Sequence, residues 1–407
     1  MTEQLSLPQK HYFRLKGMEA EEVLAQLANR TFLTDWCFPN PVLPSGKELC
    51  DLLVVFDETV IIWQAKSLKA KTTGKLREGE LQKNFRQLGG AKRQLFDLKT
   101  PITLQNARRR AEQFDPSNIR EVFLISVLLG DTPELLSMSQ RVKGHQCHVF
   151  TREFTEIVLN ELDTIADFCA YLREKERTRD RVGSFILEGG EEQILGWYLL
   201  NDRTLSRLDG CTSVFLTDGI WDEMSHRPEY QAKKKADEIS YIWDELIDRA
   251  HTSDSPEYER VARELARRNR FERRYLAQAY FDAHMKAHEN ATPEVNFRRV
   301  FVDEYGVFCF VFAHSDVSRE KRRDLLETVC FVARGKTPQH KMVVGIATEM
   351  QVRRESSLDY LLLEIPEWGP EQEVASKRLQ DEFGILRKPT RSEFSTDEYP
   401  ETSTRSG

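Results

Sequence analysis

Three polar residues, Asp51, Gln64 and Lys66, lie at the ends of two apolar runs. The runs, residues 52–56 and 59–63, are rich in β-branched residues and are separated by only two residues, a pattern typical of a β-hairpin. A carboxylate, an amide carbonyl and an ammonium in one place suit metal-assisted hydrolysis of a phosphodiester bond. The metal would polarise the phosphate and acidify a bound water. The Lys66 ammonium would orient that water or offset charge in the transition state.

The two-residue loop fixes the register of this hairpin. With residues 57–58 in the loop, Asp51 lies opposite Gln64, and Leu49 lies opposite Lys66. Directly paired residues and residues two apart on one strand share a face, so the three polar side chains converge. Both faces of the hairpin are otherwise apolar. This pattern predicts a central hairpin in a sheet that is covered on both sides.

The same residues also have an ordinary structural interpretation. Asp51 can cap a turn, Gln64 can be a polar residue near a strand end, and Lys66 can extend its ammonium into solvent. Spacings of this kind are frequent. The three residues alone therefore do not decide between a structural and a catalytic role.

The motif resembles that of the PD-(D/E)XK nuclease superfamily, in the Gln-x-Lys variant of Mrr-like restriction endonucleases. It consists of Asp51 and then Gln64-Ala65-Lys66 at the end of an apolar strand. Residues 19–95 are also similar to nuclease-like proteins that carry the sequence of residues 46–56. The resemblance covers about the first 175 residues. It implies an α/β fold with a restriction-endonuclease-like mixed sheet flanked by helices, and a nuclease dependent on Mg²⁺ or Mn²⁺.

Gln64 departs from the motif, because most members of the superfamily carry Asp or Glu at this position. A neutral ligand lowers the negative charge of the site and weakens its hold on a cation. The alternative function is therefore a catalytically inactive nuclease-fold protein that binds nucleic acid or has a regulatory role.

The resemblance also implies an acidic ligand from the first helix. Residues 17–28 place apolar side chains on one stripe, which predicts an amphipathic helix. Glu21 borders this stripe and is the preferred third metal ligand, with Glu22 as the alternative. Both carboxylates also suit a helix N-terminus for structural reasons alone. Glu48 is closer to the hairpin, but the alternation of a regular strand turns it away from Asp51.

A basic segment follows the hairpin. Residues 66–110 contain thirteen Lys and Arg and three acidic residues, a net charge of +10 in a chain of net charge −7. A polyanionic substrate favours such a segment, because neutralised phosphates supply most of the non-specific affinity for nucleic acid. Residues 84–95 have apolar positions at helical spacing, which leaves Arg86, Lys92 and Arg93 for phosphate contacts. A solvated helix with charged flanks is the alternative.

The charge pattern does not distinguish DNA from RNA, because no base-reading motif accompanies it. We expect nucleic acid as the partner, DNA before RNA, and a homodimer if both strands of a duplex are cut. No apolar run is long enough to span a bilayer, and the N-terminus lacks a signal-peptide pattern. We therefore expect no membrane partner and a cytoplasmic location. A role in antiviral defence or nucleic-acid processing is an analogy alone.

The seven cysteines are scattered without a Cys-x-x-Cys pair, so we expect reduced and mostly buried thiols. One local cluster, His145, Cys147 and His148, superficially resembles a zinc site. Zinc needs about four ligands, and the sequence shows no second cluster. An apolar strand at residues 147–150 is the preferred interpretation.

The chain is long enough for two domains. We expect a nuclease-like domain at residues 1–180, a charged helix end and linker up to residue 184, and an α+β domain at residues 185–388. The role of the second domain is open between sensing, targeting and oligomerisation. Residues 389–407 are rich in Ser, Thr, Glu and Pro, and we expect a disordered tail.

Further elements are expected from hydrophobic periodicity. The first domain should contain strands at 120–129 and 147–151 and a helical run at 154–172. The second domain should be helical over much of 229–288, followed by a hairpin at 299–313, a helix at 319–333, and strands at 341–348 and 360–365.

Overall fold

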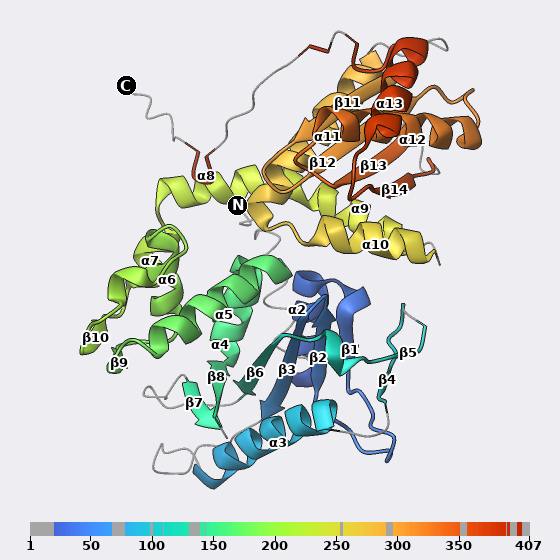
Figure 1. Cartoon of the computed structure of the whole chain (residues 1–407). Coiled ribbons are helices and arrows are strands. Elements are labelled where there is room, and N and C mark those ends of the chain that lie inside the picture. Colours follow the sequence, from blue (N-terminus) through green and yellow to red (C-terminus); the bar gives the residue numbers. More distant parts are fainter. Residues whose placement is uncertain are drawn as a thin grey trace, which may run out of the picture. The chain divides into compact units, whose positions relative to one another are not determined.

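The chain forms two compact units in the computed structural model (Figure 1), Met1–Arg227 and Pro228–Gly407. Each unit combines helices with β-sheets, so the predicted α/β class with two domains is confirmed. The structure describes residues 20–66, 78–97, 101–108, 110–129, 139–142, 144–252, 255–289, 296–350, 356–387, 389–390 and 397–400.

The first unit is built on a six-stranded mixed sheet of order β1-β2-β3-β6-β8-β7. Neighbouring strands are antiparallel from β1 to β3, parallel from β3 through β6 to β8, and antiparallel between β8 and β7. The hairpin β2–β3 is therefore an internal part of the sheet. The six strands are β1 (Cys37–Pro39), β2 (Leu52–Phe56), β3 (Thr59–Lys66), β6 (Glu121–Leu128), β7 (Ser139–Val142) and β8 (His145–Thr151).

The β2–β3 hairpin has the predicted register, since Leu52 pairs with Trp63 and the last pair encloses a two-residue turn at 57–58. Asp57 has a φ of 49°, the left-handed conformation that favours tight hairpin turns. The expected pairing of Leu49 with Lys66 is wrong. Leu49 instead donates its N–H to the carbonyl of Pro41 in a separate loop, and β3 continues alone against β6.

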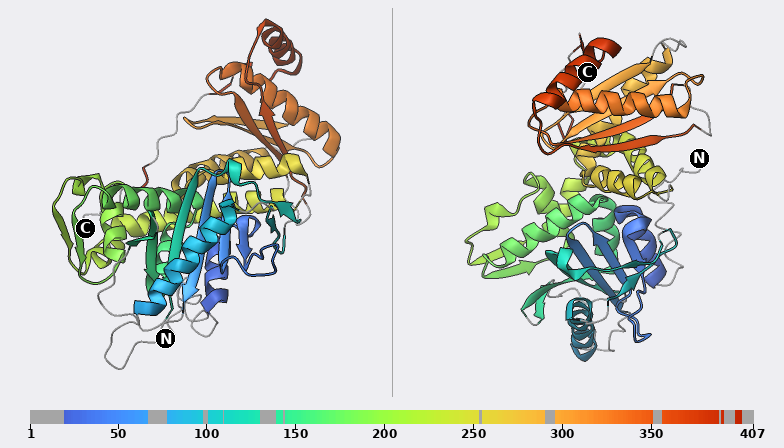
Figure 2. Two further views of the ribbon diagram at one scale, coloured as in Figure 1. Left: turned by 60° about the horizontal axis from the view of Figure 1, so that its bottom comes forward. Right: turned by 45° about the vertical axis from the view of Figure 1, so that its right-hand side comes forward.

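Helices cover both faces of this sheet, as the apolar hairpin predicted (Figure 2). Helix α3 lies across one face, where Leu53, Ile62 and Phe85 share a core. On the other face the Trp63 ring stacks on Phe168 of α5 with a centroid separation of 5.6 Å. Replacing a buried aromatic residue of this kind with alanine costs about 3–5 kcal/mol. The packing therefore holds β3 firmly from both sides.

The helices of the first unit are α2 (Ala20–Phe32), α3 (Glu78–Asp97), α4 (Arg152–Glu161), α5 (Ile165–Arg179), α6 (Glu192–Leu200) and α7 (Ile220–Ser225). Its 3-10 turns are η1 (Thr34–Trp36), η2 (Pro116–Asn118) and η3 (Ser206–Leu208). Two small sheets complete the unit, formed by β4 (Thr103–Leu104) with β5 (Glu112–Gln113) and by β9 (Ser184–Leu187) with β10 (Ser213–Leu216).

The helical run expected at residues 154–172 is divided between α4 and α5. The Thr151 hydroxyl accepts the N–H of Phe154 at the start of α4, and the Thr164 hydroxyl accepts the N–H of Asp167 at the start of α5. Such caps contribute about 1 kcal/mol each. Thr164 thus begins a second helix where periodicity alone suggested one continuous run.

Residues 184–227 belong to the first unit, so the division falls after Arg227 and not at residues 181–184, where the sequence suggested a linker. Charged residues of α5 explain the difference. Lys175 forms a buried ion pair with Glu191, and Arg177 pairs with Asp209. These ion pairs connect α5 to residues that come later in the chain.

The second unit contains a four-stranded mixed sheet of order β11-β12-β13-β14. Strands β12 and β13 are parallel, whereas β11 and β14 are antiparallel to their neighbours. The predicted hairpin at 299–313 and the strands at 341–348 and 360–365 are confirmed within a few residues. The strands are β11 (Phe297–Val302), β12 (Val307–Ala313), β13 (Met342–Glu349) and β14 (Asp359–Glu364).

Two helical layers enclose this sheet. Alternate residues of β12 face opposite cores: Cys309 packs with Leu326 of α12, and Phe308 contacts Trp243 of α9 at a centroid separation of 5.6 Å. The helices are α8 (Pro228–Asp237), α9 (Tyr241–His251), α10 (Pro256–Ala266), α11 (Arg270–Glu289), α12 (Arg319–Lys336) and α13 (Pro370–Phe383), with the 3-10 turn η4 (Glu238–Ser240). The predicted helix at 319–333 corresponds to α12.

All seven cysteines are free, and all except Cys211 are buried, which confirms the expectation that most of the thiols are internal. No described helix has the length and apolar character needed to cross a membrane. Most of the tail expected at 389–407 lies outside the described residues. Within it, the backbone carbonyls of Asp397 and Glu398 accept hydrogen bonds from Arg274 at 2.5 and 3.1 Å.

Candidate functional site

The structure brings Asp51 and Gln64 together at the end of the β2–β3 hairpin. The Gln64 Nε2 donates to Asp51 Oδ1 at 2.5 Å, and the backbone N–H of Ala65 donates to Asp51 Oδ2 at 2.6 Å. All three residues are half-buried. Asp51 directly precedes β2, so the hairpin register is what carries its carboxylate to β3. Two of the three residues that the sequence predicts to converge, Asp51 and Gln64, are therefore neighbours.

Lys66 lies two residues beyond Gln64 on β3, so strand alternation places both side chains on the same face. Its side chain is half-buried. No ion pair of its ammonium occurs among the described residues. A cation without a carboxylate partner beside the Asp51–Gln64 end of the hairpin is suited to contact a phosphate.

A fully buried amide supports Gln64 from α3. Asn84 Nδ2 donates to Ser126 Oγ of β6 at 2.6 Å and approaches the backbone carbonyl of Gln64 at 3.4 Å. Asn84 Oδ1 is buried and has no hydrogen-bond partner among the described residues. This link ties α3 and β6 to the backbone of Gln64, and it rigidifies the strand end that carries the candidate site.

Sequence reasoning missed Asn84 and Ser126, although both leave a signal. Asn84 lies three residues after Leu81 and four before Leu88, inside the apolar stripe of α3. Ser126 interrupts the apolar run 122–128 of β6. A polar residue at a position that must be buried needs a partner, and these two are partners of each other.

The helix that carries the proposed third ligand packs on the other face of the sheet from Gln64. Glu21 belongs to α2, but its side chain lies outside the described residues. The α2 helix packs on the Trp63 face through Phe32, with ring centroids 6.2 Å apart, whereas alternation puts Gln64 on the α3 face. Glu22 and Glu48 are exposed. The part of the chain that the structure describes contains no group of three or more His, Cys, Asp or Glu able to hold a metal ion.

The basic helix α3 has the predicted orientation. Arg86 and Arg93 are exposed, and neither has an ion pair within the described residues. Lys92 instead approaches His145, with 3.0 Å between Nζ and Nδ1. Burial lowers the pKa of the Lys92 ammonium, and burial followed by the charge of Lys92 lowers the pKa of His145. The buried stripe consists of Phe85, Leu88, Ala91 and Leu95.

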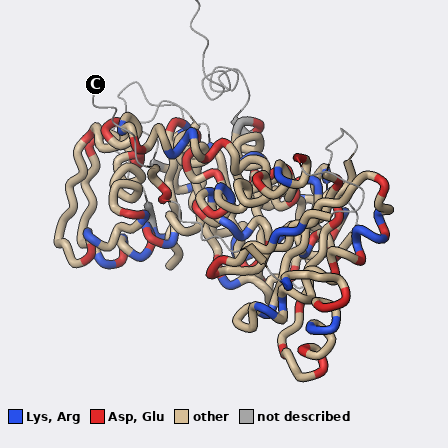
Figure 3. Tube along the Cα trace, turned by 90° about the horizontal axis from the view of Figure 1, so that it is seen from above, with Lys and Arg blue, Asp and Glu red and all other residues tan. Residues whose placement is uncertain are grey.

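Much of the basic segment cannot be placed, because residues 67–77 lie outside the described residues. In the described part of the segment, Arg108 Nη1 lies 3.6 Å from Asp35 Oδ2, so this basic residue has an acidic neighbour. Figure 3 shows acidic residues interspersed with basic ones along the described chain. The charges available to a polyanion are thus local. On α3 the described exposed cations include Lys83 as well as Arg86 and Arg93.

The His145–His148 cluster has the geometry of a strand. Cys147 packs in the core beneath α3, whereas His148 lies on the opposite face, where its Nε2 is 3.0 Å from Glu176 Oε1. Burial holds the pKa of His148 well below its usual value. Burial also raises the pKa of Glu176 to about 7. Cys147 and His148 point away from each other and do not form one ligand set.

Comparisons of the chain with protein-family models, with curated proteins and with solved structures give no match. The chemistry of the site is therefore inferred from Asp51, Gln64 and Lys66 and from the residues that hold them.

Proposed function

We propose that the first unit is a metal-dependent endonuclease that hydrolyses phosphodiester bonds in DNA, with RNA as the alternative substrate. The hydrogen bond between Asp51 and Gln64 carries this proposal, because it joins a carboxylate and an amide at one end of an internal hairpin. The mixed sheet with helices on both faces agrees with the fold that the resemblance to PD-(D/E)XK nucleases implies.

Asp51 and Gln64 would hold the metal through oxygen atoms, which are the ligands that Mg²⁺ and Mn²⁺ prefer. Gln64 now presents its amide nitrogen to Asp51, so a shared metal requires the amide to turn and present Oε1. Glu21 is the candidate for a third ligand. When bound, the metal supplies Lewis acidity and a water of lowered pKa.

The other residues have roles in positioning and charge. The Lys66 ammonium would orient the attacking water and offset charge on the phosphate in the transition state. Arg86 and Arg93 would neutralise neighbouring phosphates of the substrate. Asn84 is a positioning residue, because it acts on the strand end through Ser126 and the Gln64 carbonyl.

Cleavage of both strands of a duplex would require two such sites, and a homodimer would supply them. A cytoplasmic location and a role in nucleic-acid defence or processing accompany this proposal. Both rest on analogy with nucleases that act on intracellular nucleic acid.

One observation favours a second candidate function, a catalytically inactive nuclease-fold protein that binds nucleic acid. Both carboxylate oxygens of Asp51 already accept hydrogen bonds from the protein, and the neighbouring Gln64 carries no charge. A carboxylate whose oxygens already accept hydrogen bonds gains less free energy when it binds a metal. In this case Lys66, Arg86 and Arg93 would bind phosphates without cleavage.

The test uses the purified full chain with MgCl₂ or MnCl₂ and separate DNA and RNA substrates, single- and double-stranded. We expect Asp51→Ala and Lys66→Ala each to lower the cleavage rate by roughly 100-fold or more, because each removes a group that acts on the transition state. Glu58→Ala and Arg120→Ala are matched controls, since this exposed pair lies at the turn end of the same hairpin. They should retain the wild-type rate.

Cleavage that persists in both Asp51→Ala and Lys66→Ala rejects the assigned site. Salt-sensitive binding without cleavage by the wild-type chain supports the second candidate. The absence of both binding and cleavage with all four substrates rejects both functions.

A further inference from the structure

The second unit contains a cavity of about 480 Å³ that is rich in arginine. Arg249 of α9 and Arg319 and Arg323 of α12 contribute to its wall, together with hydroxyl-bearing residues such as Ser255. None of the described residues that line it is acidic. Its volume lies within the range typical of small-molecule sites. Three guanidinium groups around one cavity indicate an anionic ligand.

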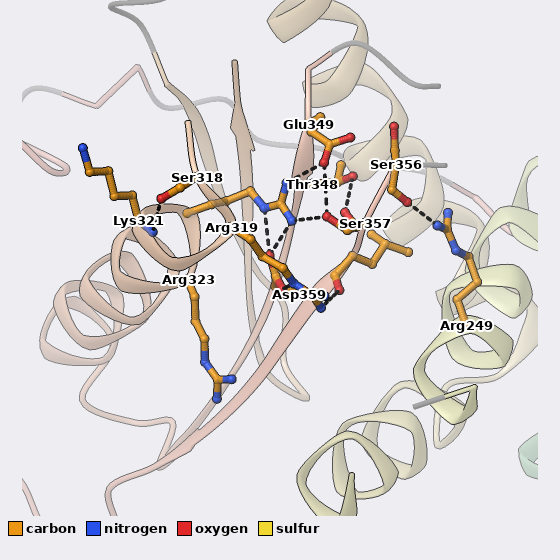
Figure 4. A network of polar contacts seen from close by, with 12 residues as sticks. Arg249, Ser318, Arg319, Lys321, Arg323, Thr348, Glu349, Ser356, Ser357 and Asp359 are labelled. Atoms are coloured by element: carbon orange, nitrogen blue, oxygen red, sulfur yellow. Dashed lines mark hydrogen bonds and ion pairs between the residues drawn. The ribbon is translucent and has the colours of Figure 1, made fainter. Parts of the chain in front are cut away.

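Arg249 supplies a charge that no carboxylate of the described residues neutralises. Its Nη2 donates to the backbone carbonyl of Ser356 at 2.6 Å, and no carboxylate pairs with it among the described residues. The side chain is exposed, and its remaining N–H groups are available to a ligand. Figure 4 shows Arg249 entering from α9, while Arg323 comes from α12 with the Arg319–Asp359 pair between them.

A buried network holds Arg319 in place. Arg319 donates to Asp359 Oδ1 at 2.6 Å and to the backbone carbonyl of Leu358 at 3.2 Å. Asp359 is itself buried and also accepts from Arg322, which donates in addition to Glu349 at 2.9 Å. The fixed Arg319 guanidinium lowers the entropy that binding would otherwise cost.

Arg323 and Ser255 complete the polar wall with replaceable contacts. Arg323 is exposed and lies 3.2 Å from Glu257 and 3.5 Å from Glu327, as surface pairs of small energetic value. Ser255 precedes α10 without making a side-chain cap, so its hydroxyl has no described partner. Both side chains can therefore turn to a ligand at little cost.

We propose that this cavity binds the phosphate group of a small phosphorylated molecule. The planar guanidinium fork matches phosphate oxygens in two-point hydrogen bonds, and a phosphomonoester carries close to two negative charges at pH 7. The hydroxyl of Ser255 adds a donor for a phosphate oxygen. This site lies within the second unit and is independent of the function proposed for the first.

The surroundings of the cavity favour a small ligand over a nucleic-acid chain. Glu257 and Glu327 flank Arg323 and would repel the phosphates that extend on either side in a polymer. The chain outside residues 66–110 has a net charge of −17, which does not attract a long polyanion. A single terminal phosphate avoids both penalties because the cavity receives it locally.

The test is isothermal titration calorimetry on the full chain with sodium phosphate, sodium pyrophosphate and AMP as separate probes. At least one probe should bind the wild-type chain. We expect Arg249→Gln to weaken its binding at least tenfold and Arg323→Gln to weaken it several-fold. Arg378→Gln is the matched control, because this exposed arginine of the same unit lies on α13, outside the cavity. It should leave the affinity unchanged.

A second variant keeps the test independent of lost contacts. Ser255→Glu adds a carboxylate to the cavity wall without removing a described hydrogen bond, and we expect it to abolish binding while the melting temperature stays near that of the wild type. The proposal is overturned if none of the three probes binds or if all variants bind equally. It is also overturned if only a DNA or RNA oligonucleotide binds and loses affinity in Arg249→Gln. Binding retained in Asp51→Ala separates this site from the proposed nuclease.

Discussion

The hairpin site of the first unit and the arginine cavity of the second differ in how far the protein itself satisfies their charged side chains. The Asp51 carboxylate accepts two hydrogen bonds from neutral donors close to it in the fold. Within the described part of the chain, Arg249 has a single carbonyl partner, and its other donors are available to an incoming group. A side chain satisfied by the protein needs a local change before it binds a ligand, whereas one that is unsatisfied is ready. The difference teaches that a recognisable motif and an available charge are separate properties.

The two regions also differ in what supports them. The hairpin site is held by hydrogen bonds among uncharged groups, through Asn84 and Ser126. The cavity is supported by the buried ion pair of Arg322 with Asp359. Loss of one member of a buried ion pair leaves the other charge without compensation, while loss of a neutral hydrogen bond costs less. Variants in the two regions should therefore span a wide range of effects.

The largest effect is expected in the second unit. Arg322→Ala should lower the free energy of unfolding by about 3–5 kcal/mol, because it leaves Asp359 buried with only the exposed Arg319 as a described cationic partner. Urea unfolding followed by tryptophan fluorescence measures the change. Arg249→Gln is the control and should change stability by less than about 0.5 kcal/mol. If both variants lower the free energy of unfolding equally, Arg322 is not a structural residue in a way that Arg249 is not.

The first unit should be the more sensitive to pH through Glu176. Burial raises its pKa to about 7 from an ordinary value of 4.5, so the folded state binds a proton that the unfolded state releases. The resulting stabilisation is complete below pH 4.5 and is lost as the pH rises through 7, by on the order of 2 kcal/mol. Urea unfolding between pH 5 and 8 measures it. Glu176→Gln should make the profile less steep without flattening it, because the buried Glu191 of the same unit also has a pKa raised to about 7. An unchanged profile in this variant would exclude Glu176 as a cause.

Gln64→Glu tests how the hairpin site depends on charge. A second carboxylate beside Asp51, without the Nε2 donor, should lower the unfolding free energy by about 1–2 kcal/mol in EDTA. Mg²⁺ or Mn²⁺ should restore stability, because the two carboxylates then share a cation. Thermal unfolding with and without the metal measures both changes. Gln87→Glu, on the exposed face of α3, is the control. If the metal does not stabilise Gln64→Glu, the hairpin end is not a metal site.

Asn84→Ala should have the smallest effect, about 1 kcal/mol of destabilisation. The lost donor leaves Ser126 Oγ and the Gln64 carbonyl with fewer partners, but the variant also removes the unpaired Oδ1. Chemical denaturation measures the stability, and the same protein is assayed for cleavage. A loss of cleavage much greater than the loss of stability would support a positioning role. Equal small losses would indicate a purely structural link.

The sequence was sufficient for the local features of the fold. The β2–β3 register follows from a two-residue turn, so the meeting of Asp51 and Gln64 could be predicted from residues close together in the chain. The apolar stripe of α3 was equally local. Lys66 lies on the expected face, but its expected neighbour Leu49 belongs to a loop that a regular register cannot foresee.

Features that depend on distant residues were not predictable in this way. The cavity takes Arg249 from α9 and Arg319 and Arg323 from α12, which no spacing rule connects. The charged end of α5 read as a linker, because its partners Glu191 and Asp209 come later in the sequence. Charge runs are ambiguous until their counter-charges are known.

The ion pair between Lys175 and Glu191 determines how the chain can be divided for expression. Both side chains are buried, and burial lowers the pKa of Lys175 and raises that of Glu191 to about 7. A fragment that stops near residue 184 would retain Lys175 and lose Glu191, its carboxylate partner in the buried ion pair. A fragment that ends at Arg227 keeps both partners. Recombinant work on the hairpin site should therefore use the longer fragment.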